Sequence, residues 1–286
     1  MNSQSIHGHV LFAFFFTHLI TKFQRNLKLG SGFKALSVWA LLLTSTAHGE
    51  AVSIRADEWS PINTDPRATN RGIMIELAET MLAESGLTVD YKVMQWEAAL
   101  SSVKAGEHDC VVGALRSDVP DGFLLPKKPW VVSQQTVYAR ADRDYRVNSI
   151  DDLSAYTLGV SDGYSYGKEL DDYRDANANN PARIYVARSN RPVRDLILRL
   201  NTSQIQLALE TSVVMEYNII SANLVGRIKS AGTPVKTRED LYIACSAAVP
   251  TSKRYIEIFD EALPKLRASG KFAEILKRYN VSNWEN

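Results

Sequence analysis

Histidine is scarce in this chain. The 286 residues include five histidines, and four of them (His7, His9, His18 and His48) precede residue 49. If that segment is removed as a leader, for reasons given below, His108 is the one that remains. A Ser/His/Asp or Cys/His catalytic set would then depend on His108, and a zinc cluster built from histidines is excluded. We expect His108 to be a solvated turn residue, and we expect neither a metal nor a cofactor.

Cysteine is equally sparse, with two residues, Cys110 and Cys245. Each lies in an apolar run, so one interpretation is a pair of buried thiols. The other is a disulfide between them, which an exported chain permits. A reactive nucleophile is the least favoured role, because neither cysteine has a histidine or a basic residue directly beside it.

A strong net charge is also absent. The formal net charge is +1, and residues of both signs are mixed along the sequence. A protein that binds nucleic acid would show a basic patch, so we expect no nucleic-acid partner. With 45% hydrophobic and 23% charged residues, the chain is long enough for two globular domains and too balanced to be disordered.

Long hydrophobic runs are confined to the N-terminal segment. Lys28 and Lys34 precede the apolar run 35–43, and small residues then lead to Gly49. This run is shorter than the roughly 20 residues that a membrane span needs. The pattern predicts a signal segment over residues 1–49, cleaved during export to the periplasm, with an uncleaved anchor as the alternative. After residue 50 no stretch resembles a transmembrane helix.

From residue 51 onward, strand and helix patterns alternate as in an α/β protein. The charged run 140–146 and the turn 232–234 interrupt the series, so we predict two lobes with two crossovers and a ligand cleft between them. Residues 50–138 and 235–286 would form lobe 1, and residues 139–234 would form lobe 2. The predicted strands are 51–56, 89–93, 110–114, 132–140, 157–160, 183–187, 205–209 and 241–247.

Polar residues follow two of these strands where a ligand would be met. In open α/β sheets, ligands bind outside the carboxyl ends of the strands. The chain turns polar after Gly113, which brings Gly113, Arg116 and Ser117 to that edge. Glu210 follows strand 205–209 in the same way, although it could also be the N-cap of the helix that comes next.

Several different short motifs follow one another along the chain. Trp59-Ser60-Pro61 follows the first strand, Gly72 to Leu77 opens the first helix, and Ser269 to Phe272 precedes the last helix. Asp152-Leu153, Gly159-Val160 and Gly163 lie between them. In this order and spacing the chain resembles the type II periplasmic solute-binding proteins, in particular the polar-amino-acid-binding group that serves ABC transporters. The resemblance covers nearly all of the chain after residue 50 and implies a two-lobed, Venus-flytrap fold.

The resemblance also implies site residues. In this family an aromatic near Trp59 lies against the ligand, a hydroxyl at Ser117 helps to hold its carboxylate, and an acid at Glu210 binds its ammonium group. The loop Gly163-Tyr164-Ser165, at a helix N-terminus, suits an anion. The family's carboxylate-binding arginine is replaced by Pro120 in this chain. Arg116 could supply a guanidinium from another angle, or it could face solvent.

We therefore predict a periplasmic protein that captures a small polar solute, an amino acid or a related zwitterion or anion, for the permease of an ABC transporter. We expect a monomer without enzymatic activity. One alternative is a sensory receptor that acts with a membrane signalling partner. A less favoured alternative is a dehydratase-like enzyme, in which Glu58, Glu76 or Glu210 would be a buried acid.

Overall fold

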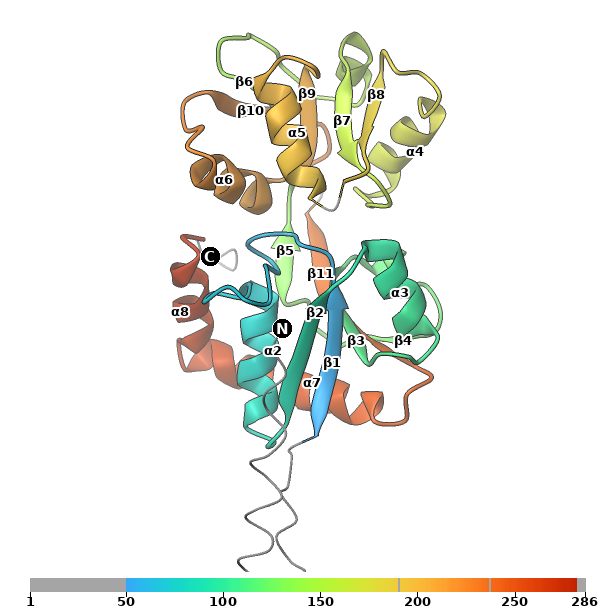
Figure 1. Cartoon of the computed structure of the whole chain (residues 1–286), viewed down its shortest axis with the longest axis vertical. Coiled ribbons are helices and arrows are strands. Elements are labelled where there is room, and N and C mark those ends of the chain that lie inside the picture. Colours follow the sequence, from blue (N-terminus) through green and yellow to red (C-terminus); the bar gives the residue numbers. More distant parts are fainter. Residues whose placement is uncertain (1–49, 190, 237, 282–286) are drawn as a thin grey trace, which may run out of the picture. The chain divides into compact units, whose positions relative to one another are not determined.

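The computed structural model describes residues 50–189, 191–236 and 238–281. They lie within one compact unit, Gly49–Asn286, which contains two mixed sheets with helices on both faces of each (Figure 1). The predicted α/β class is thereby confirmed. The predicted leader, residues 1–49, lies outside the described residues. Within the described ranges, no helix combines the length and the hydropathy that a membrane span requires.

The sheet of lobe 1 has the strand order β2-β1-β3-β11-β4, and β5 pairs with β11 at a further position. Strand β1 runs parallel to β2 and to β3, because a helix lies between each pair of strands in the chain. Strand β11 returns antiparallel to β3. The bounds are β1 (Ala51–Ala56), β2 (Thr88–Val93), β3 (Cys110–Ala114), β4 (Phe123–Leu124), β5 (Val131–Ser133) and β11 (Glu239–Ser246).

Helices cover both faces of this sheet. Val52 and Ile54 of β1 pack in one core with the apolar residues of three helices, α2 (Ile73–Ala83), α7 (Ser252–Ala268) and α8 (Lys271–Arg278). Val111 and Ala244 point to the other face and pack against α3 (Trp96–Lys104). Trp130 is fully buried in the first of these cores, with its ring edge-on to Phe259 at 5.0 Å between centroids.

The sheet of lobe 2 has the order β10-β6-β9-β7-β8. Strand β7 is parallel to β8 and β9, whereas β6 is antiparallel to β9 and β10. Two helices pack on one face of this sheet and one on the other. The bounds are β6 (Gln135–Arg140), β7 (Leu158–Ser161), β8 (Ile184–Ala187), β9 (Leu207–Thr211), β10 (Ile228–Gly232), α4 (Lys168–Ala176), α5 (Pro192–Asn201) and α6 (Ser212–Ser221), with a short 3-10 helix η3 (Asp151–Ala155) before β7.

The chain crosses between the lobes earlier than the sequence suggests. The apolar run 132–140 resembles a single strand, but the structure divides it into β5 in the first sheet and β6 in the second. The first crossing therefore lies between Ser133 and Gln135 instead of at residue 138. The second lies between Gly232 and Glu239, as β10 ends and β11 begins. Strand β10 was not predicted, because IKSAG is a short edge strand with buried residues only at Ile228 and Ala231 and without a continuous apolar pattern.

Cys110 and Cys245 face each other across the β3–β11 pairing and form a disulfide. Both are fully buried. Of the two interpretations that the sequence leaves open, the structure contains the bridge. The disulfide links β3 to β11, the strand that follows the second crossing of the chain, back from lobe 2.

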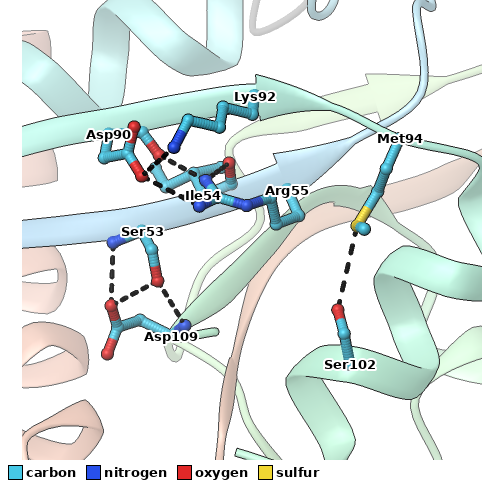
Figure 2. Close-up of polar contacts among 8 residues, drawn as sticks. All are labelled: Ser53, Ile54, Arg55, Asp90, Lys92, Met94, Ser102 and Asp109. Atoms are coloured by element: carbon cyan, nitrogen blue, oxygen red, sulfur yellow. Dashed lines mark hydrogen bonds and ion pairs between the residues drawn. The ribbon is translucent and has the colours of Figure 1, made fainter. Parts of the chain in front are cut away.

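Two polar clusters join β1 to its neighbours in the sheet (Figure 2). The buried Arg55 donates to the carbonyl of Asp90 at 2.6 Å and pairs with the Asp90 carboxylate at 2.8 Å, which links β1 to β2. On the other side, Asp109 Oδ2 accepts from the backbone N–H and the hydroxyl of Ser53, at 2.8 and 2.6 Å. Every one of these bonds is made within the chain, so the clusters stabilise the sheet.

Candidate functional site

A cavity lies between the lobes at the carboxyl ends of β1, β3 and β9. Its volume is about 30 Å³. That is far smaller than the roughly 300 to 1,000 Å³ of typical ligand pockets, so the lobes are close together here. Residues of both lobes line it: Asp57, Trp59, Trp96, Val112, Gly113, Leu115 and Asp118 from lobe 1, with Gln135, Tyr164, Ser165, Tyr166 and Glu210 from lobe 2.

Glu210 is the central acid of this cavity. It is the penultimate residue of β9 and is 1% exposed. Its Oε1 accepts from the Trp59 indole N–H at 3.2 Å and from the Thr211 N–H at 2.7 Å, whereas its Oε2 is buried and has no hydrogen-bond partner. Burial raises the pKa of Glu210 to about 8. The N-cap of α6 is Thr211, whose hydroxyl accepts from Val214 N, so Glu210 does not serve as that cap.

Asp57 is a second acid in the lining, and the sequence did not single it out. It is the first residue after β1, and the Tyr164 hydroxyl of lobe 2 donates to its Oδ2. Burial raises the pKa of Asp57 to about 6, although the bond from Tyr164 acts in the opposite direction. Its position at the carboxyl end of a central strand was the signal that could have identified it.

Trp59, predicted to lie against a ligand, is at the wall of the cavity. Its ring lies edge-on to Tyr164, with 6.1 Å between centroids. Gly113 allows this position, because a Cβ there would lie 3.3 Å from the Trp59 ring and because its φ of +83° favours glycine. The predicted residues Trp59, Gly113, Tyr164, Ser165 and Glu210 thus come together in one lining.

Arg116 and Ser117 are not among the lining residues. Both are exposed in the short 3-10 helix η2 (Arg116–Asp118). The guanidinium of Arg116 stacks over the Tyr242 ring at 5.0 Å, which satisfies it away from the cavity. The Ser117 hydroxyl lies 3.3 Å from the Ser165 hydroxyl and so forms a contact between the lobes.

The start of α4, predicted to suit an anion, already holds a carboxylate of the chain. Asp171 Oδ1 accepts from the Tyr166 N–H at 3.0 Å, and its Oδ2 accepts from the Ser165 hydroxyl at 2.6 Å. Arg174 pairs with the same carboxylate at 3.0 Å. Gly163, the remaining predicted residue of this loop, faces Glu97 of α3: a Cβ on Gly163 would lie 3.0 Å from Glu97 Oε1.

Other bonds join the lobes around the cavity. Arg191 pairs with Glu58 at 3.0 Å, and the Asn218 amide donates to the Ser60 carbonyl at 2.9 Å. A neighbouring cavity of about 240 Å³ shares the lining residues Asp57, Trp96 and Tyr164 with the first. The two cavities are therefore adjacent.

The lining of the first cavity supplies carboxyl groups, an amide and aromatic rings. No group of three or more potential metal ligands of the His, Cys, Asp or Glu type is found in the part of the chain that the structure describes. Sequence reasoning missed Asp57, Trp96, Asp118 and Gln135 in this lining. Trp96 and Gln135 lie at the first positions of α3 and β6, and no local motif distinguishes them as site residues.

Comparison with known proteins agrees with this architecture. Residues 52–282 match the family model of the bacterial extracellular solute-binding proteins, family 3. No curated protein sequence matches the chain. Among solved structures, a histidine kinase sensor domain with similarity to periplasmic binding proteins has a TM-score of 0.66 and 16% identity, over 81% of this chain and 96% of that one.

Two further structures are similar to the same extent. A periplasmic binding protein of an arginine transport system from Legionella pneumophila has a TM-score of 0.63 and 17% identity, over 81% of this chain and 100% of that one. A structure from work on glutathione import in Streptococcus mutans has a TM-score of 0.68 and 15% identity, over 81% and 95% of the two chains. At such identities the likeness shows the fold, which is that of type II periplasmic binding proteins.

Proposed function

The chain belongs to the bacterial extracellular solute-binding proteins, family 3, as its motifs predicted, and we propose that it captures a small polar solute bearing an amino group between its two lobes. The observation that carries this proposal is the buried carboxyl of Glu210, which belongs to lobe 2. One of its oxygens accepts a hydrogen bond from Trp59 of lobe 1, and the other has no hydrogen-bond partner. Such a group is costly to bury unless a ligand completes its hydrogen bonds.

Capture would then lead to transport. Closure of two lobes around a solute gives the bound form a surface that the open form lacks, and we propose the membrane permease of an ABC transporter as the partner that recognises it. The family is extracellular or periplasmic, and the Cys110–Cys245 disulfide suits an exported chain. Cleavage of residues 1–49 as a signal segment remains part of the same proposal.

Catalysis is not part of it, since members of this family bind solutes and are not enzymes. Two of the acids considered for a dehydratase are engaged elsewhere. Glu58 pairs with Arg191, and Glu76 accepts from Arg278 and Tyr279. The likeness to a kinase sensor domain supports sensing as the second candidate function. Uptake of a labelled solute that fails when the gene is deleted would favour transport, and a lost transcriptional response with normal uptake would favour sensing.

Thermal unfolding tests solute capture. The full chain is produced for export, stripped of carried-over solute by unfolding and refolding, and heated with amino acids, amines, dicarboxylates and sugars, each added separately. A solute at about a thousand times its Kd adds roughly 4 kcal/mol to the unfolding free energy, which raises Tm by roughly 10 °C. The shift should be lost in Glu210→Gln and kept in Glu169→Gln, which changes an exposed acid of α4. If no class of solute raises Tm, the proposal is wrong.

A further inference from the structure

The walls of the cavity are acidic and aromatic. Its lining contains three carboxyl side chains and four aromatic rings, but no lysine, arginine or histidine belongs to the lining residues described above. An ammonium group is attracted both to carboxylates and to the electron-rich faces of aromatic rings. The carboxyl groups are Asp57, Asp118 and Glu210, and the rings are Trp59, Trp96, Tyr164 and Tyr166.

Two buried oxygens of this lining have no hydrogen-bond partner, and both are on paired strands. They are Glu210 Oε2 on β9 and Gln135 Oε1 on β6. Gln135 is the first residue of β6 and Glu210 the penultimate residue of β9, and both line the cavity at this end of the strand pair. The Gln135 amide oxygen is an acceptor, and Glu210 Oε2 becomes one when the carboxyl, whose pKa is about 8, loses its proton. A cationic donor such as an ammonium group favours the ionised carboxylate and supplies hydrogen bonds to both oxygens.

Three of the nearby cations have other partners, and a fourth, Arg188, lines only the adjoining cavity. Arg174 pairs with Asp171 and with Asp175, at 3.0 and 2.8 Å. Arg191 pairs with Glu58, and Arg116 stacks on Tyr242. A carboxylate brought into the cavity would lose its water without gaining a cation and would face the acids already there. Both effects oppose its binding.

We propose that the solute is a protonated primary amine without a carboxylate, whose ammonium group lies between Glu210 and Gln135 beside the Trp59 and Tyr164 rings. This inference rests on the proposed function and narrows it. It departs from the zwitterion or anion that the motifs imply, because Arg116 stacks on Tyr242 outside the lining and the helix start of α4 is occupied by the Asp171 carboxylate.

Pairs of solutes that differ by one carboxylate test the proposal without knowledge of the solute's size. We would titrate the full, solute-free chain by calorimetry with lysine and cadaverine, arginine and agmatine, and leucine and 3-methylbutylamine. In at least one pair the amine should bind about tenfold more tightly than its amino acid, because a buried carboxylate without a cation costs at least about 1.4 kcal/mol. Choline, which has no N–H donor, should bind more weakly than the best amine.

Three variants assign the contacts. Glu210→Gln should weaken amine binding at least about tenfold, the loss of a charge-assisted bond, whereas the exposed Glu169→Gln should leave it unchanged. Arg188 is the strongest competitor, because it lies in the adjoining cavity, where it pairs with Asp162 at only 3.6 Å. Arg188→Ala should leave amine affinity unchanged.

A proton count separates a direct contact from a loss of folding. Groups that interact electrostatically with Glu210 are Asp57, Tyr138, Tyr164 and Tyr166, and Asp118 shares its cavity. With its carboxyl protonated before binding, Glu210 must release a proton to the bulk when an ammonium group arrives. The binding enthalpy of the wild type at pH 7 should therefore differ between phosphate and Tris buffers, and it should be the same in both for Glu210→Gln.

The outcomes are distinct. Binding of amines above their amino acids, with proton release, supports the proposal. Equal or tighter binding of an amino acid, lost in Arg188→Ala, overturns it and leaves solute capture intact. Preference for choline also overturns it, because the two acceptors would stay unpaired. Binding of a dicarboxylate or sugar alone overturns the amine but not the capture, and the absence of any binding overturns both.

Discussion

Strand β1 leads from a partly buried polar region, in which Arg55 is the buried side chain, to the buried lining of the cavity, and the two regions differ in how their hydrogen bonds are completed. In the clusters of Figure 2, Ser53 and Arg55 find their partners in Asp109 and Asp90. Two residues beyond Arg55, the cavity begins at Asp57. There, Glu210 Oε2 and Gln135 Oε1 have no hydrogen-bond partner. Burial raises the pKa of Asp57 and the pKa of Glu210.

The difference separates stability from binding. A buried polar group whose partners are supplied by the chain stabilises the fold, because its desolvation is offset by bonds that form on folding. A buried acceptor without a partner destabilises the empty protein and is completed when a ligand supplies the donor. Substitutions in the first region should therefore change unfolding, and substitutions in the second should change binding, with opposite effects on stability.

The largest effect is expected from the Cys110–Cys245 disulfide, which lies beside the first region because Cys110 follows Asp109 in the chain. Cys110 and Cys245 are separated by 135 residues in sequence, and a crosslink that closes so long a loop contributes about 5 kcal/mol in the chain-entropy model. The double variant Cys110→Ala/Cys245→Ala should lose up to this amount in urea unfolding. Amine affinity per folded molecule should not change, since neither cysteine lines the cavity. A variant as stable as the wild type would contradict the prediction.

The next effect concerns Arg55. Arg55→Met keeps much of the length of this buried side chain but removes its bonds to Asp90 and to the Ile54 carbonyl. We expect a loss of about 2 kcal/mol in unfolding free energy. The matched control is Arg67→Met, because Arg67 pairs with Asp65 while its own side chain is 87% exposed, and such pairs contribute about 0 to 1 kcal/mol. Equal losses in the two variants would show that burial does not distinguish them.

An effect of opposite sign on stability is expected at the cavity. The pKa of Glu210 is about 8 in the folded chain, against 4.5 for the ordinary carboxyl. The folded state thus holds a proton that the unfolded state has released, so stability falls as pH rises from about 4.5 to about 8. Asp57 acts in the same direction up to about pH 6. The Tm of the solute-free chain should be lower at pH 8 than at pH 5.

The control is Glu210→Gln, which cannot ionise. Its Tm should fall less between pH 6 and pH 8, and at pH 8 it should exceed that of the wild type by roughly 2 to 4 °C, equivalent to about 1 kcal/mol for a chain of this size. Heating both proteins across this range in calorimetry measures the difference. If Glu210→Gln were the less stable protein at pH 8, the carboxyl would belong with the stabilising clusters of Figure 2.

The fold could be predicted from the sequence to a large extent, because strand and helix periodicities and short motifs are local. The alternation of apolar runs indicated an α/β fold with two lobes. Trp59 was implied by the family resemblance, and Glu210 by its place at a strand end together with that resemblance. The division of 132–140 was not predictable, because β5 and β6 share one apolar pattern and differ in which sheet pairs with them.

The surroundings of the site were predicted less well. The contacts of Arg116 and of the loop before α4 are made with residues outside the motifs from which their roles were predicted. Arg116 stacks on Tyr242, 126 residues later, and Asp171 fills the helix start from within α4. Gln135 and Asp57 come from different lobes and line one cavity, and no single stretch of sequence carries that information.

The smallest effect should come from Tyr164→Phe, which probes the contact between the lobes across the cavity. The variant retains the ring beside Trp59 and removes the hydroxyl that donates to Asp57. A solute that needs Asp57 no longer competes with that hydroxyl, so we expect amine affinity to rise about threefold, which corresponds to a hydrogen bond of about 0.7 kcal/mol. The empty chain should also open more readily, which small-angle scattering would record as a larger radius of gyration.

Tyr173→Phe removes a buried hydroxyl of α4 that has no hydrogen-bond partner and does not line the cavity, so it should change neither quantity. A fall in affinity for Tyr164→Phe would mean that the hydroxyl contacts the solute itself, and Tyr164 would then act as a binding group and not as a bond that holds the empty lobes together.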